Sequence, residues 1–175
     1  MRKRFNSYWL GLAFLLGSFG LQAQDSPIAP WLGEWSGTLE IYTTKGLNQT
    51  VAMELNVAVK SDSSWQWQIV YGEGDNRQER NYELLTTQEP GQYIIDEKNG
   101  IELYLSLIDK GLYSVFKVNR NNLLVFYELK GDELVFRTLS ANTTTELKSG
   151  GGENIPEVLS WKTGVSQTAV LTKNK

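Results

Sequence analysis

The feature that most constrains the fold of this 175-residue chain is an alternation of apolar and polar residues with a period of two. Successive side chains of a β-strand point to opposite faces of a sheet, so this period is typical of strands with one buried face. It recurs in nearly every segment, whereas a helical period never persists. The sequence therefore predicts an all-β protein.

Short turns separate most of the alternating segments, and Lys98-Asn99-Gly100 is a strong hairpin signal because Asn-Gly tolerates positive φ. Strands joined by short turns pair in sequence order and form a meander. A meander of about ten strands with one apolar face closes into an up-and-down barrel, which removes exposed sheet edges. We therefore expect a single antiparallel up-and-down β-barrel. The expected strands span residues 35–42, 50–60, 65–71, 77–86, 92–97, 101–107, 112–118, 123–129, 134–139 and 164–172.

The alternation breaks once, between Asn142 and Trp161. Ser149-Gly-Gly-Gly152 interrupts the chain there, and Asn154-Ile-Pro-Glu157 is similar to the capped start of a helix. We expect a loop with one helical turn in this segment. The last strand then returns to pair with the first strand and closes the barrel.

The N-terminus has the features of a secretion signal. A basic start, Arg2-Lys3-Arg4, precedes an apolar run at residues 8–21 and the small residue Ala23. A transmembrane anchor is the alternative, but the run has about 14 residues where a span needs about 20. We therefore expect a cleavable signal peptide and no stable membrane span after its removal.

This organisation divides the chain into a signal peptide at residues 1–23, a short linker at 24–30 and one barrel domain at 31–175. The expected localisation is secreted or periplasmic. Because the chain has no cysteine, it lacks the residue to which a bacterial lipoprotein attaches its lipid. We expect an exported protein without a lipid anchor.

The absence of histidine and cysteine excludes several kinds of chemistry. Without them there is no Ser-His-Asp triad, no Cys-His pair, no thiolate or imidazole zinc site and no His-ligated haem. We expect no catalytic residue, no cofactor and no metal site. Removing the signal peptide takes away three of the 17 basic residues and none of the 20 acidic ones, which leaves a net charge of −6. Such a surface repels phosphate backbones, so nucleic acid is not an expected partner.

Two short motifs carry a family resemblance: Gly33-Glu34-Trp35 opens the first strand, and Arg137 lies in a late one. Through them the chain resembles the calycin superfamily of lipocalins, fatty-acid-binding proteins and nitrobindin-like barrels. The resemblance implies that Trp35 closes the barrel floor, with Gly33 at the strand start and Arg137 packed over the indole. It departs from lipocalins in having no long helix after the barrel, and from fatty-acid-binding proteins in having no helix pair between the first two strands. The haem-ligating histidine of nitrobindin-like barrels has no counterpart here, so no haem is implied.

Arg80 and Tyr82 are two residues apart in an expected strand and project from the same face as Leu84. Fatty-acid-binding proteins hold a ligand carboxylate with such an Arg-x-Tyr pair, although on a later strand. A guanidinium and a phenol about 7 Å apart could both donate hydrogen bonds to one anionic group. The alternative is a solvated edge strand, which the nearby Glu79 and Glu83 favour.

Several aromatic residues fall on expected inward faces and could line an apolar cavity. Barrels of about eight to ten strands are either packed solid or hold one small ligand, so a filled core is the alternative. Three carboxylates around the hairpin, Asp96, Glu97 and Glu102, are expected to form a solvated turn rather than an acid-base cluster. The aromatic candidates for the cavity wall are Trp65, Trp67, Tyr71, Phe116, Tyr127 and Phe136.

Three functions fit these observations. The first is an exported lipocalin-like protein that binds a small hydrophobic ligand, with or without an anionic group, in a barrel cavity and without catalysis. The second is a structural barrel of the cell envelope that contacts another protein or a glycan, and a filled interior would favour it. The third is a barrel enzyme that uses Arg, Tyr and Glu as acid and base, which needs a carboxylate and a tyrosine together in the cavity. The sequence leaves the ligand's identity and the oligomeric state open.

Overall fold

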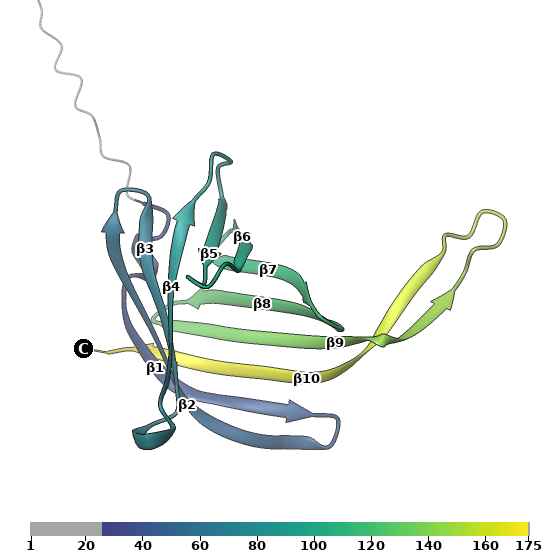
Figure 1. Ribbon diagram of the computed structural model, residues 1–175, viewed down its shortest axis with the longest axis horizontal. Helices are drawn as coiled ribbons and strands as arrows, with labels where there is room; N and C mark the ends of the chain where they lie inside the picture. Colours follow the sequence, from purple (N-terminus) through teal and green to yellow (C-terminus); the bar gives the residue numbers. More distant parts are fainter. Residues whose placement is uncertain (1–25, 175) are drawn as a thin grey trace, which may run out of the picture.

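The computed structural model describes residues 26–174, and over this range the chain forms a closed barrel of ten antiparallel strands (Figure 1). Each strand pairs with its neighbours in the sequence, and the last strand pairs with the first. The predicted all-β, up-and-down barrel is therefore confirmed. The expected signal peptide, residues 1–23, lies outside the described residues.

The strands are between five and 17 residues long, and two short 3₁₀ turns are the helical elements of residues 26–174. No helix in this part of the chain is long and apolar enough to cross a membrane. In chain order the elements are η1 (Ala29–Trp31), β1 (Gly33–Thr43), β2 (Gly46–Ser61), β3 (Ser64–Tyr71), η2 (Gly74–Asn76), β4 (Gln78–Thr86), β5 (Gln92–Asp96), β6 (Glu102–Ile108), β7 (Gly111–Val118), β8 (Asn121–Lys130), β9 (Glu133–Ser149) and β10 (Val158–Lys173).

The barrel closes where β1 pairs with β10. Leu39, in the middle of β1, lies opposite Val51 on one side and Ala169 on the other, so the core continues across the closing pair. Gly37 lets the two strands approach closely, because a Cβ at this position would collide with the Val170 carbonyl oxygen. A buried inner face and one position without a side chain together fix the register of the closing pair.

One end of the barrel is closed by the segment that precedes β1. Ile28 and Trp31 are 0% and 1% exposed, and the Trp31 ring lies 6.1 Å from the ring of Trp67 in β3. The Nε1–H of Trp35 donates a hydrogen bond of 2.9 Å to the carbonyl oxygen of Trp31, which ties this segment to β1. The floor of the barrel is therefore built from Trp31 and Ile28 together with the buried Trp35.

The cation that packs over Trp35 is Lys173 rather than Arg137. The Lys173 ammonium lies 5.3 Å from the centroid of the Trp35 ring, within the range of a cation–π contact. Gly33 leaves room for it, since a Cβ there would lie 2.5 Å from the Lys173 Cε. Arg137 is exposed and lies over Phe126 at 5.8 Å. Its neighbours in β9 face inward, so Arg137 points to the outer wall and cannot form the pairing that the family resemblance implies.

β9 and β10 extend beyond the barrel as a two-stranded arm (Figure 1). The prediction of a loop with a helical turn at residues 142–161 is wrong, because β9 continues to Ser149 and β10 begins at Val158. A run of threonines before Ser149 favours extended backbone, and only the glycine-rich tip turns. Register shifts between Trp161 and Val165 interrupt the pairing of the two strands. The β-rich composition of the segment thus outweighs its helix-start signal.

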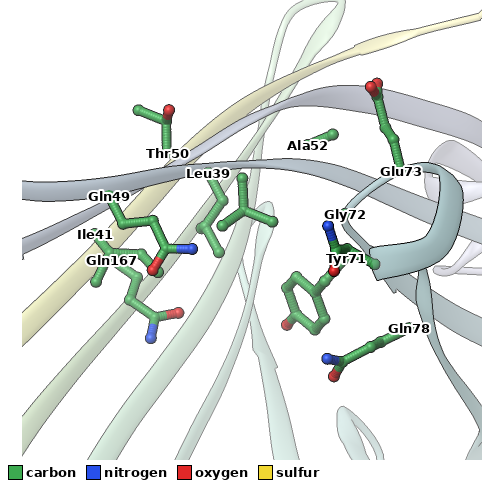
Figure 2. A pocket seen from close by; sticks show the side chains of 12 residues that line it. Leu39, Ile41, Gln49, Thr50, Ala52, Tyr71, Gly72, Glu73, Gln78 and Gln167 are labelled. Atoms are coloured by element: carbon green, nitrogen blue, oxygen red, sulfur yellow. The ribbon is translucent and has the colours of Figure 1, made fainter.

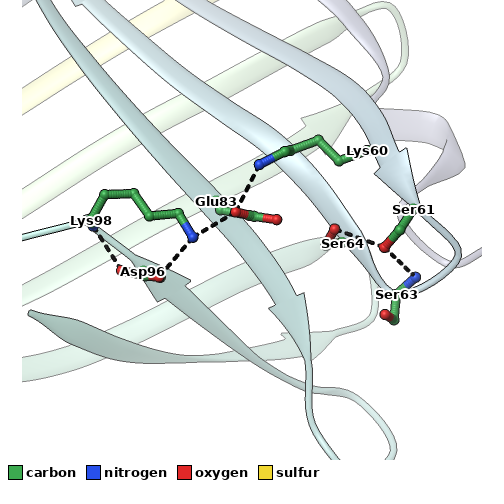
Figure 3. Close-up of polar contacts among 7 residues, drawn as sticks. All are labelled: Lys60, Ser61, Ser63, Ser64, Glu83, Asp96 and Lys98. Atoms are coloured by element: carbon green, nitrogen blue, oxygen red, sulfur yellow. Dashed lines mark hydrogen bonds and ion pairs between the residues drawn. The ribbon is translucent and has the colours of Figure 1, made fainter. Parts of the chain in front are cut away.

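A network of ion pairs on the outer wall ties β4 to β2 and to the turn after β5 (Figure 3). The Glu83 carboxylate accepts a hydrogen bond of 2.8 Å from Lys60 Nζ and lies 2.6 Å from Lys98 Nζ. Lys98 also contacts Asp96 at 2.8 Å. Because Lys60 and Lys98 stabilise its charged form, the pKa of the Glu83 carboxyl falls to about 2. The network is therefore a source of acid-sensitive stability.

We expect Glu83→Gln to lower the free energy of unfolding by about 1 kcal/mol near pH 7, as for partly exposed ion pairs. The folded-state pKa of Glu83 lies below its ordinary value of 4.5, so its contribution is present above that pH and is lost as the pH falls towards 2. Urea unfolding at about pH 7 and about pH 3 measures both effects, and the gap between variant and wild type should shrink at the lower pH. Glu79→Gln, on the same strand but 44% exposed, is the matched control. An equal loss in both variants contradicts the prediction.

Candidate functional site

The barrel encloses a cavity of about 260 Å³, which we call the barrel cavity. Strands β3 to β9 form its wall, and alternate residues of these strands contribute, as the inward faces of a barrel require. Trp67, which packs on Trp31 of the floor, lies in this wall. The interior of the barrel is therefore partly open rather than completely filled.

The structure brings most of the sequence-predicted site residues together in the wall of the barrel cavity. Trp65 is the exception: it is 4% exposed and packs edge-on against Tyr93, at 6.2 Å, away from the cavity. The predicted residues that line the cavity are Trp67, Tyr71, Arg80, Tyr82, Phe116, Tyr127 and Phe136.

Three aromatic rings form the deep part of the wall. The rings of Trp67 and Tyr127 meet edge to face at 5.2 Å and 87°, and Tyr127 lies 5.0 Å from Phe136. These distances and angles are those of favourable aromatic pairs, which hold each ring in place. Burial raises the pKa of Tyr127 well above its usual range, so its phenol is neutral. The deep wall is thus apolar and rigid, and it suits a flat or aliphatic group.

Arg80 and Tyr82 lie on the inner face of β4, where the barrel cavity opens towards solvent. Arg80 is exposed and Tyr82 is half-buried. Glu97 lines the cavity with them and is near enough to Tyr82 to raise the pKa of its phenol. Among residues 26–174, Arg80 takes part in no ion pair. A guanidinium without a carboxylate partner at the mouth of a cavity is a site for an anionic group.

The phenols at this mouth stay protonated at neutral pH. Burial raises the pKa of Tyr71 to about 12; the neighbouring Tyr82 adds to this rise and Arg80 opposes it. Burial also raises the pKa of Tyr82, and the Glu97 carboxylate raises it further. Both hydroxyls can therefore donate hydrogen bonds to a ligand that is held near Arg80.

A larger hollow of about 890 Å³ lies at the end of the barrel away from the floor (Figure 2). Amide side chains of Gln49, Gln78 and Gln167 surround it, so it is more polar than the barrel cavity. Tyr71 lies in the wall of both spaces. The hollow therefore adjoins the barrel cavity at Tyr71, on the side that faces solvent.

Two polar atoms in residues that line the barrel cavity have no hydrogen-bond partner. They are Nε1 of Trp67 and Oγ of Ser114, and both are buried. A buried donor or acceptor that is left unpaired costs about 1 to 3 kcal/mol, and most such groups in folded proteins are paired. Both atoms are buried within the wall, so neither is accessible to a ligand in the cavity.

Sequence reasoning missed several residues of the site. Ser114 and Thr138 line the cavity because they share a strand face with Phe116 and Phe136, and that alternation was readable in the sequence. Glu97 was expected in a solvated turn, yet it follows directly after β5 and lines the cavity with Tyr82. Ser114 and Thr138 could have been predicted by including every inward-facing residue of a strand, and not aromatic residues alone. Trp31 was placed in the barrel domain but not among the floor residues, and the structure puts it in a 3₁₀ turn ahead of β1.

No protein-family model matches this sequence, and no curated protein matches it. Solved structures do match. A protein of unknown function from the DUF3598 family of Nostoc punctiforme superposes with a TM-score of 0.56 at 13% identity; the match covers 82% of this chain and 47% of that one, so this chain spans about half its length. The S-type phycobiliprotein lyase of Guillardia theta also gives a TM-score of 0.56, at 7% identity, over 82% of this chain and 88% of that one.

At such low identities these matches show the fold alone. Residues 26–174 therefore form a closed β-barrel whose fold is similar to that of these two structures.

Proposed function

We propose that this chain is an exported member of the calycin superfamily that binds a small, mainly apolar ligand with an acidic group in the barrel cavity, without turnover. The observation that carries the proposal is the combination of an aromatic cavity with an exposed guanidinium, Arg80, that has no ion-pair partner among the described residues. Burial of the apolar part would supply most of the affinity. Arg80, Tyr82 and Tyr71 would fix which end of the ligand faces solvent.

The volume of the cavity limits the size of the ligand. About 260 Å³ is the liquid volume of roughly nine water molecules. At the packing density of protein interiors, this suits a ligand of about ten to fifteen non-hydrogen atoms. A bicyclic aromatic acid or a medium-length fatty acid fits inside the barrel cavity, whereas a tetrapyrrole would have to extend through the mouth into the adjoining hollow.

Native mass spectrometry of the protein purified from its own cell envelope tests the proposal. We expect a small bound molecule, and a chain mass that lacks residues 1–23 because the signal peptide has been cleaved. Thermal-shift titrations with aromatic acids, fatty acids, retinoids and tetrapyrroles then rank ligand classes, and the small acids should stabilise most. No bound mass, together with no stabilisation by any apolar ligand, would refute the carrier function. An uncleaved chain in the cytoplasm would refute export.

A structural or interaction role in the envelope is the second candidate. The arm formed by β9 and β10 favours it, because Leu147, Ile155 and Leu159 are 66%, 59% and 41% exposed. In this role the barrel cavity would have no function. Co-purification of an envelope protein or glycan without any small molecule would support this function in place of the first.

The barrel-enzyme alternative requires a carboxylate and a tyrosine together in the cavity, and Glu97 with Tyr82 supplies that pair. The raised pKa of Tyr82 keeps its phenol protonated, so it would act as an acid and not as a base. Incubation of the purified protein with its co-purified ligand distinguishes the two cases. An unchanged ligand mass agrees with a carrier, and a changed mass with an enzyme.

A further inference from the structure

We infer that the hollow beside the barrel cavity binds a hydroxyl-rich group, of the kind that a sugar ring supplies, and that this group belongs to the same ligand as the apolar part in the cavity. This inference rests on the proposed function and names the solvent-facing end of its ligand. The ligand would be an apolar group joined to a sugar acid. Its acidic group would lie at Arg80, and its hydroxyl groups would lie among the amides of Gln49, Gln78 and Gln167.

The inner face of the barrel changes from apolar to polar where the hollow begins. Along β2 the inward side chains of residues 51–57 are apolar, and the next inward position towards the hollow is Gln49. Along β10, Ala169 and Leu171 lie in the core, and the next inward position is Gln167. Because strand alternation sends these amides to the inner face, they belong to the barrel interior and not to its outer wall.

The register of the strands brings the amides together around the hollow. Gln49 and Gln167 lie directly opposite Ile41 of β1, one on each side, and Gln78 lies opposite Tyr71. Figure 2 shows Gln49 and Gln167 on one side of the hollow and Gln78 with the Tyr71 ring on the other. A group held in the hollow would therefore meet amides from two sides.

The three amides are accessible, and the fold does not use them. Gln49 and Gln78 are exposed and Gln167 is half-buried. Among residues 26–174, none of these three side chains forms a hydrogen bond with another protein group. By contrast, Gln68 on the outer wall is bonded to two asparagines, at 2.9 Å and 2.6 Å. The amides of the hollow therefore remain available to a ligand.

The side chains that line the hollow set the chemistry of the group that it binds. An amide both donates and accepts hydrogen bonds, so three amides suit a group that does the same, as hydroxyl groups do. The apolar side chains of Leu39 and Ile41 lie beside them and suit the CH groups of a sugar ring. Glu73 also lines the hollow, and its carboxylate disfavours a second anionic group there. The lining thus favours an uncharged, hydroxyl-rich group.

The position of Arg80 joins the hollow to the barrel cavity as one binding site. Arg80 follows Gln78 by two residues on β4, so the two side chains stand about 7 Å apart on the same face. Tyr71 lies in the wall of both spaces. A carboxylate at Arg80 and hydroxyl groups at Gln78 can therefore belong to one sugar acid, whose apolar substituent enters the cavity. This continuity favours a single ligand over two separate ones.

Two aryl acids of equal charge test the inference. The β-glucuronide of 2-naphthol carries a carboxylate and several hydroxyl groups, whereas 2-naphthyloxyacetate has the same aryl ether and a carboxylate but no hydroxyl group. With the purified protein, isothermal titration calorimetry should show about five- to tenfold tighter binding of the glucuronide, the effect of one or two added hydrogen bonds. In the double variant Gln49→Leu with Gln167→Leu, this preference should fall to about twofold or less.

Gln66→Leu is the matched control, because Gln66 lies on the outer face of β3 and lines neither space. It should keep the full preference for the glucuronide. Saturation-transfer difference spectra of the wild-type protein give a readout that does not depend on any variant folding, and the sugar protons should receive saturation along with the naphthyl protons. Methyl β-glucuronide, which has no aryl group, should bind at least about 100-fold more weakly than the naphthyl glucuronide.

Equal affinity of the wild-type protein for the two aryl acids, or sugar protons that receive no saturation, overturns the inference while leaving the carrier function standing. A preference that survives in the double variant, or that Gln66→Leu lowers equally, also overturns it. If methyl β-glucuronide binds as tightly as the naphthyl glucuronide, the hollow takes a separate sugar and the single-ligand inference is wrong. If neither aryl acid binds and no small molecule co-purifies, the proposed function fails and the inference fails with it.

Discussion

Replacing Arg80 with alanine should weaken the binding of a small aromatic acid by about 10- to 100-fold, which corresponds to about 1 to 3 kcal/mol. Arg80 is exposed and takes part in no ion pair among the described residues, so the change removes the anion's charge partner and leaves the core intact. Isothermal titration calorimetry with naphthalene-2-carboxylate measures the loss. Naphthalene-2-carboxamide, which has no charge, should bind wild type and variant with nearly equal affinity.

Arg77→Ala is the matched control for this substitution. Arg77 is an arginine of the same part of the chain, but it forms ion pairs with Glu54 at 3.0 Å and Glu79 at 3.2 Å and does not line the barrel cavity. It should leave the affinity for both compounds unchanged. If Arg77→Ala weakens acid binding as much as Arg80→Ala does, the loss reflects the net charge of the protein and Arg80 is not the anchor.

The inner wall of the barrel could be predicted from single strands. A strand places every second residue on one face regardless of the strands beside it. The inward direction of Trp67, Tyr71 and Phe116 could therefore be predicted from the alternation within each strand. The same rule put Arg80 and Tyr82 on one face, and both line the cavity. Closure into a barrel followed from short turns between the strands and from one apolar face per strand.

Depth along the barrel could not be predicted in this way. Trp65 points to the same face of β3 as Trp67, but it packs against Tyr93 in the filled part of the core. The stagger between strands and the residues of the floor decide which part of the interior stays empty. The position of Glu97 depends on the register of β4 with β5, which a sequence does not state. The cation over Trp35 likewise depends on which residue the closing pair brings there. Each miss concerns a contact between strands and not a property of one strand.

Residues 24–30 were expected to be a linker and Trp31 to begin the barrel domain, and both Ile28 of the linker and Trp31 belong to the core. Trp31 is 1% exposed, contacts the Trp67 ring and accepts the hydrogen bond of Trp35 through its carbonyl oxygen. A ten-strand barrel has two open ends, and an unfilled end would expose the deep aromatic wall to water. The short segment ahead of β1 therefore contributes to the stability of the barrel and forms the closed end of the barrel cavity.

Trp31→Ala should accordingly lower the free energy of unfolding by about 3 to 5 kcal/mol, the range for truncating a fully buried aromatic residue. Urea unfolding monitored by far-ultraviolet circular dichroism measures the loss. Trp161→Ala, which truncates a half-buried tryptophan in the arm, should cost about 1 kcal/mol or less. Trp31→Ala should also free the Trp67 indole from one side and so weaken ligand binding in the protein that remains folded. If both variants lose the same small amount of stability, the barrel closes without this segment, and Trp35 alone forms the floor as the family resemblance implied.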